Sequence, residues 1–125
     1  MSEENKKPVI GSIVWRDLTV PNAEEVKDFY CEVVGWKASL HPGCDDFNIH
    51  QADDEVMAGV CYAKGTNANV PPQWLVYVTV ASVEESAAKC VEMGGKVLDG
   101  PRMMGANLFC VIQDPAGAVM GLIEG

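Results

Sequence analysis

Apolar and polar residues alternate near the start of each half of the chain. The even positions of both segments carry apolar side chains: Val14, Leu18 and Val20 in one, and Trp74, Val76, Val78 and Val80 in the other. A period of two is typical of a β-strand with one buried face. We therefore predict a strand in each segment, with the even positions buried and the odd positions on an open face.

A helical pattern follows each of these strands. Asn22 with Glu25, and Ser82 with Glu85, have the spacing of a capping box, and glycines at 35 and 94–95 supply helix ends. The apolar residues lie at helical spacing in both segments: Val26, Phe29, Tyr30 and Val33, then Val83, Ala87, Cys90 and Val91. The pattern predicts two helices that each cover the even face of a sheet.

Three shorter strands are predicted after each helix. They span 36–40, 46–51 and 56–62, then 96–98, 107–113 and 118–124. Residues 53–54 and 114–117 are typical of turns, and residues 64–72 carry the prolines, asparagines and glycine of a linker. Residues 100–105, with glycine at both ends and two methionines between them, fit either a mobile flap or an ordinary surface loop.

The two halves are related by internal repetition. At an offset of 60 the segment 19–35 matches 79–95, and at an offset of 62 Phe47, Gln51 and Gly59 fall on Phe109, Gln113 and Gly121. We predict one α+β domain over 11–125, preceded by a disordered tail over 1–10. Its two tandem βαβββ modules span 11–63 and 73–125, joined by the linker 64–72.

Composition narrows the classes of function. The chain has 125 residues, 48% hydrophobic, with a formal net charge of −9, which repels phosphate backbones and anionic lipid. No apolar stretch approaches the about 18 residues of a membrane span, and the N-terminus lacks the pattern of a targeting signal. The five scattered cysteines fit reduced thiols. We expect a cytoplasmic protein that binds neither nucleic acid nor membrane.

Several strings resemble the vicinal oxygen chelate superfamily, which includes glyoxalase I, bleomycin-resistance proteins and extradiol dioxygenases. Residues 15–19 (WRDLT), 28–30 (DFY) and 35–36 (GW) resemble the opening of its small members, and 114–122 (DPAGAVMGL) resembles their closing hairpin. The resemblance implies the glyoxalase/bleomycin resistance fold, in which two βαβββ modules form a curved mixed sheet with a concave cleft.

The same resemblance places the family's metal ligands. Aligned with it, the four ligand positions fall on Trp15, Gly59, Leu75 and Gly121. None of these side chains offers an imidazole, carboxylate or thiolate donor. The resemblance therefore implies that the family's metal site is lost, and we expect no metal and no cofactor.

The predicted ligand-binding residues lie on the odd face of the strands and beside it: Trp15, Asp17, Met57, Gly59, Leu75, Tyr77, Arg102 and Gly121. The aromatic residues fit either platforms for a flat ligand or filling of the core. Asp17 suits a general base, an anchor for a cationic group of the ligand, or a backbone cap. The glycines leave room for a ligand or mark a bulge, and Arg102 suits an anion clamp.

Other chemistry has weaker support. His41, Cys44, Asp45 and His50 lie close in sequence, but a single His-x-x-Cys spacing without a second pair does not predict a metal site. Cys61 lacks an evident histidine partner and is not expected to be a nucleophile. The sequence shows neither a phosphate-binding glycine loop nor a Ser-His-Asp constellation.

These observations predict a metal-free small-molecule-binding protein of the glyoxalase/bleomycin-resistance type. It would sequester a drug or metabolite, cationic or neutral in view of the acidic chain, and the resemblance favours a homodimer. The alternative is a glyoxalase-like lyase or isomerase, either metal-free with Asp17 and Tyr77 as acid/base groups or with displaced metal ligands. A third class is a module that assembles with another chain.

Overall fold

A computed structural model describes residues 8–125, which form an α+β fold of two βαβββ modules. The chain divides into two compact units. The N-terminal unit is Trp15–Leu75, and the C-terminal unit comprises Val76–Gly125 together with the described residues up to Val14. The predicted tail over 1–10 falls largely outside the described residues, which begin at Pro8.

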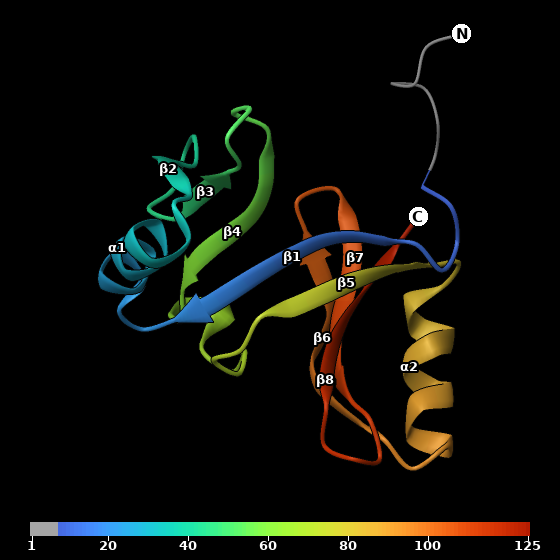
Figure 1. Ribbon diagram of the computed structural model, residues 1–125. Helices are drawn as coiled ribbons and strands as arrows, with labels where there is room; N and C mark the ends of the chain where they lie inside the picture. Colours follow the sequence, from blue (N-terminus) through green and yellow to red (C-terminus); the bar gives the residue numbers. More distant parts are fainter. Residues whose placement is uncertain (1–7) are drawn as a thin grey trace, which may run out of the picture. The chain divides into compact units, whose positions relative to one another are not determined.

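The N-terminal unit carries one helix and four strands, ordered β2-β3-β4-β1 (Figure 1). Its elements are β1 (Ile13–Val20), α1 (Ala23–Val34), β2 (Lys37–Leu40), β3 (Phe47–His50) and β4 (Val56–Tyr62). β1 runs parallel to β4, and the other pairs are antiparallel. A short 3₁₀ helix, η2 (Gly65–Asn67), lies in the predicted linker.

The C-terminal unit repeats this arrangement with the order β5-β8-β7-β6. Its elements are β5 (Leu75–Val80), α2 (Val83–Glu92), β6 (Lys96–Met104), β7 (Asn107–Gln113) and β8 (Val119–Glu124). The start of the described chain joins this unit, because Gly11 N–H donates to the Thr79 carbonyl at 2.8 Å and Thr79 N–H donates to the Ser12 carbonyl at 2.9 Å.

Strand register reproduces the two repeat offsets read from the sequence. Asp17 in β1 pairs with Gly59 in β4, and Tyr77 in β5 pairs with Gly121 in β8. The first members of these pairs are 60 positions apart and the second members 62. The sequence repeat therefore has a counterpart in the internal pairing of each unit.

The two helices begin differently. Ser82 Oγ accepts from the Glu85 N–H at 3.2 Å, which confirms the capping prediction for α2. Asn22 makes no such bond to the backbone; its Nδ2 donates to Glu25 Oε1 at 3.0 Å, so the same prediction is wrong for α1. Gly35, with a φ of 86°, ends α1 as expected, since the left-handed region favours glycine.

Each helix packs on its own sheet around an apolar cluster. In the N-terminal unit Leu18, Ile49 and Val60 form the centre of the cluster. Phe29 and Val33 of α1 are 56% and 65% exposed, so only part of the predicted apolar stripe is buried. The apolar face of α1 is therefore wider than the part of it that packs on the sheet.

β6 corrects the prediction for residues 96–105. The strand continues from 96 to 104, so residues 100–104 are strand and not a flap or surface loop. β6 is the last strand in the order of its unit, and its register shifts between Val97 and Asp99 and again before Arg102. Edge strands and bulges tolerate proline, which explains how Pro101 is accommodated.

All five cysteines are free thiols, as expected from their spacing. Within the part of the chain that the structure describes, neither helix is long and apolar enough to cross a membrane.

Candidate functional site

A row of residues crosses the N-terminal sheet on the face opposite the apolar cluster. The paired positions are Ser39 in β2, Asn48 in β3, Gly59 in β4 and Asp17 in β1. Directly paired residues of neighbouring strands project to the same side. Three polar side chains and one side-chain-free position therefore share this face, which we call the polar row.

Trp15 and Asp17 flank the side-chain-free position. A Cβ placed on Gly59 would lie 3.5 Å from Trp15 Cζ2 and 3.6 Å from Asp17 Cβ, which are ordinary van der Waals distances. Asp17 itself is only 6% exposed. Gly59 therefore leaves room for one added carbon atom, between an indole edge and the Asp17 side chain.

Met57 and Cys61, two residues before and two residues after Gly59 on β4, add no reactive group. Burial raises the pKa of the Cys61 thiol far above its ordinary value, and the nearby Asp17 charge raises the pKa further. The thiol is protonated and unreactive at neutral pH, in agreement with the sequence prediction. Met57 packs against the apolar cluster of its unit, which favours the core-filling role for this residue.

The predicted open face of the C-terminal unit is closed around Tyr77. This side chain is 3% exposed, and Thr79 is 1% exposed. A Cβ on Gly121 would overlap ring carbons Cδ2 and Cε2 of Tyr77, so the ring already occupies the space that we expected glycine to leave for a ligand. Leu75 is likewise fully buried.

Arg102 lies near the same tyrosine and forms an ion pair with Asp99. Its Nε and Nη2 donate to the two carboxylate oxygens of Asp99 at 2.9 and 2.8 Å, and its guanidinium stacks 4.6 Å from the Phe109 ring centroid. These hydrogen bonds to the Asp99 carboxylate raise the pKa of the guanidinium. Because a carboxylate already compensates its charge, Arg102 is less suited to clamp an anion than the sequence predicted.

The predicted site residues thus fall into two groups. Trp15, Asp17 and Gly59 meet in the N-terminal unit, and Tyr77, Gly121 and Arg102 lie together in the C-terminal unit. The role of Asp17 and Tyr77 as acid/base groups stays a prediction.

The donor set does not fit the metal that the fold family implies. Gly59 and Gly121 carry no donor, and the ring of Tyr77 covers Gly121. Among residues 8–125, no three His, Cys, Asp or Glu side chains group in a way that could hold a metal ion. In the sequence cluster near His41, Asp45 instead forms an ion pair with Lys64 at 3.2 Å.

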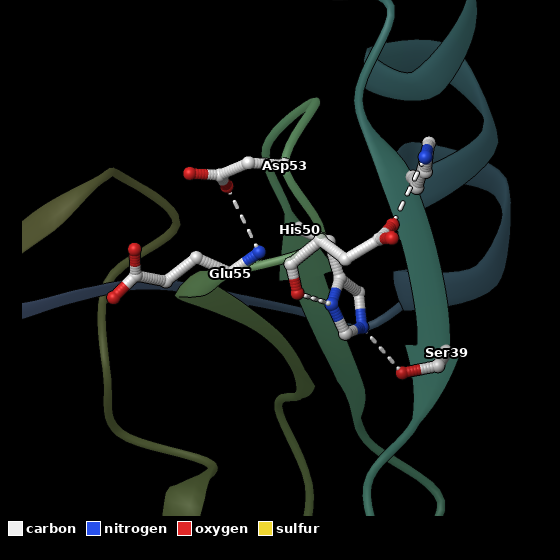
Figure 2. A network of polar contacts seen from close by, with 6 residues as sticks. Ser39, His50, Asp53 and Glu55 are labelled. Carbon is white, nitrogen blue, oxygen red and sulfur yellow. Dashed lines mark hydrogen bonds and ion pairs between the residues drawn. The ribbon is translucent and has the colours of Figure 1, made fainter.

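Sequence reasoning missed a pair of polar side chains on β2 and β3. Ser39 Oγ lies 2.7 Å from His50 Nε2, and His50 Nδ1 lies 2.9 Å from the Asp54 carbonyl oxygen (Figure 2). The pair depends on the antiparallel register, in which Lys37 pairs with His50 and Ser39 with Asn48, and no signal in the sequence indicated it.

Comparison with known proteins identifies the family. The family model of the glyoxalase-like domain matches residues 13–123, and the chain therefore belongs to this family. Solved structures from the glyoxalase/bleomycin resistance/dioxygenase superfamily share its fold, as the resemblance in sequence implied.

Two curated relatives come from Streptomyces. The anthracycline biosynthesis protein DnrV of Streptomyces peucetius is 27% identical over 92% of this chain and 49% of its own length. DauV of Streptomyces sp. strain C5, also an anthracycline biosynthesis protein, is 26% identical with the same coverage. The chain spans about half the length of these curated relatives.

Solved structures share the fold at low identity. A glyoxalase/bleomycin resistance protein/dioxygenase superfamily member from Vibrio splendidus 12B01 has a TM-score of 0.56 and 10% identity, with 89% of this chain and 97% of that chain covered. Methylmalonyl-CoA epimerase from Streptomyces coelicolor has a TM-score of 0.53 and 13% identity, with 94% and 99% covered.

Proposed function

We propose that the protein binds a flat, neutral or cationic small molecule without a metal ion, on the face of the N-terminal sheet at Gly59. The observation that carries this proposal is the side-chain-free position between Trp15 and Asp17. An indole offers a stacking surface, and a carboxylate fixes a positive group of the ligand. Drug or metabolite sequestration is the role that such a site supports.

Charge favours this ligand class. Asp17 is 6% exposed, so its carboxylate acts in surroundings with little water, where an ionic contact is stronger than at the surface. The whole chain has a formal net charge of −9, which attracts cations.

The curated relatives support a polycyclic aromatic ligand. Both are named for anthracycline biosynthesis, and anthracyclines combine a flat ring system with an amino sugar. The proposal extends to the homodimer and the cytoplasmic location predicted from the sequence; light scattering after gel filtration tests the dimer.

Doxorubicin, a cationic anthracycline, and its neutral aglycone provide matched probes. We expect doxorubicin to raise the melting temperature equally with and without EDTA. Trp15→Ala should weaken binding of both probes about tenfold, the loss of one stacking contact. Asp17→Asn should weaken binding of doxorubicin alone. Arg16→Gln serves as the control, because Arg16 is exposed and lies between Trp15 and Asp17 in β1.

Three outcomes would contradict the proposal. A melting-temperature shift that disappears with EDTA would show that a metal is required. Equal affinity of the Trp15→Ala variant and the unaltered protein would place binding elsewhere. Failure to bind either doxorubicin or its aglycone would contradict the proposed ligand class.

A further inference from the structure

Ser39 and His50 have the geometry of a nucleophile and its base. The Oγ–Nε2 distance of 2.7 Å is that of a short hydrogen bond between a hydroxyl and an imidazole. The other ring nitrogen, Nδ1, faces a backbone carbonyl, which can only accept a hydrogen bond. In neutral His50 the proton therefore resides on Nδ1, and Nε2 accepts the proton of the serine hydroxyl.

The carbonyl that orients His50 is itself held in place. Asp54 has a φ of 69°, the only positive φ of a non-glycine residue among those described. Its N–H donates to the Gln51 carbonyl at 2.9 Å, and its carboxylate accepts from Lys37 Nζ at 2.9 Å. Figure 2 shows the Asp53 carboxylate, which accepts from the Glu55 N–H at 3.0 Å and closes the same turn.

The surroundings of Ser39 suit an approaching carbonyl compound. Ser39 is exposed and His50 half-buried, so a substrate can reach the hydroxyl. Asn48 pairs directly with Ser39, and its amide on the same face offers N–H donors. Beyond Asn48, Gly59 leaves the next position of the polar row without a side chain.

We propose that Ser39, with His50 as its base, is a nucleophilic site that takes small activated esters. The Asp54 carbonyl acts as the third group that orients the base, as the carboxylate does in a catalytic triad. Asn48 would stabilise the negative charge that develops on the substrate carbonyl oxygen. The reaction at Ser39 requires neither Trp15 nor Asp17, so it can be tested separately from the ligand binding proposed above.

The reaction balances without a cofactor. Ser39 Oγ forms a bond to the ester carbonyl carbon while its proton passes to His50 Nε2. The bond between that carbon and the leaving oxygen breaks, and the alcohol leaves with the proton from His50. Water then attacks the acyl-serine and gives one proton to His50; the bond to Oγ breaks, Ser39 recovers the proton, and the carboxylic acid is released.

A fluorophosphonate, which forms a stable bond with activated serines, tests the proposal on the full chain. Mass spectrometry of peptides should locate the adduct on Ser39, at a rate about 100-fold above that of Ser86, a half-buried serine of α2 without a histidine partner. p-Nitrophenyl acetate should give a burst of p-nitrophenolate. Ser39→Ala should abolish both signals, and Ser86→Ala should change neither.

His50→Ala separates a catalytic from a structural role. We expect labelling of Ser39 to fall about 100-fold and added imidazole to restore it, which loss of a merely structural bond would not produce. Absence of an adduct on Ser39 would overturn the proposal, as would unchanged labelling in the His50→Ala variant. If circular dichroism shows that this variant is unfolded, the Ser39-to-Ser86 labelling ratio of the unaltered protein decides alone.

Discussion

Replacement of each paired glycine by alanine tests the difference between the two units. Gly59 and Gly121 hold equivalent strand positions, and neither has a positive φ, so alanine itself causes no backbone strain at either site. Their surroundings differ. The nearest atom to a Cβ on Gly59 is 3.5 Å away, whereas a Cβ on Gly121 would overlap the Tyr77 ring, with Cγ only 3.0 Å away.

The expected free energies follow from this geometry. Overpacking of a closed core costs about 1–3 kcal/mol, and a compatible Gly→Ala change recovers about 0.4–1 kcal/mol through the unfolded state. Gly121→Ala should therefore lower the unfolding free energy by about 1–2 kcal/mol, whereas Gly59→Ala should leave it unchanged or raise it slightly. For a domain of this size the first change corresponds to a melting temperature lower by roughly 4–8 °C.

Urea unfolding and thermal melts followed by circular dichroism measure both values. The same Gly59→Ala protein should bind doxorubicin more weakly, because the methyl group enters the space proposed for the ligand. Equal stability of Gly121→Ala and the unaltered protein would refute the reasoning, since it would show that Tyr77 does not occupy the space above Gly121.

Three further results are expected. Ser82→Ala should destabilise the protein by about 1 kcal/mol in urea unfolding, and Asn22→Ala by less, because only Ser82 caps a backbone N–H. Ile49→Ala should cost about 2–5 kcal/mol by the same measurement, whereas Leu40→Ala, at a position 65% exposed, should cost less than about 0.5 kcal/mol. Burial raises the pKa of the Cys110 thiol from 9.0 to about 11, so the folded protein keeps a proton that the unfolded chain loses. As the pH rises between these values, the Cys110 thiol should lower the unfolding free energy by about 1.4 kcal/mol per pH unit. Cys110→Ala should flatten this dependence of the unfolding free energy on pH. An unchanged dependence would contradict the raised pKa of Cys110.

Most of the fold could be predicted from local patterns. The bounds of β4 and β7 match the predicted 56–62 and 107–113, because each is a short apolar run that turn residues bound. The exceptions depend on packing. β6 runs on through Pro101 since its edge position tolerates the missing N–H, and Asn22 bonds a side chain instead of the backbone.

The candidate site was only partly accessible to sequence reasoning. The repeat and the family resemblance indicated Trp15, Asp17 and Gly59, which the structure brings together. Neither could show that Tyr77 fills the space at Gly121, because equivalent positions in a repeat carry different side chains. The pair of Ser39 and His50 was missed since it depends on the register of two strands and on a carbonyl in the following turn.

The sequence by itself determined the class of fold and the order of the elements, because hydrophobic periodicity and turn signals are properties of the chain. The expectation that Trp15, Gly59, Leu75 and Gly121 are the family's ligand positions, without donor side chains, came from the family resemblance. Only the tertiary structure decided which glycine is left open and which serine meets a histidine. Those outcomes depend on distances between residues far apart in the sequence, and no local pattern encodes such distances.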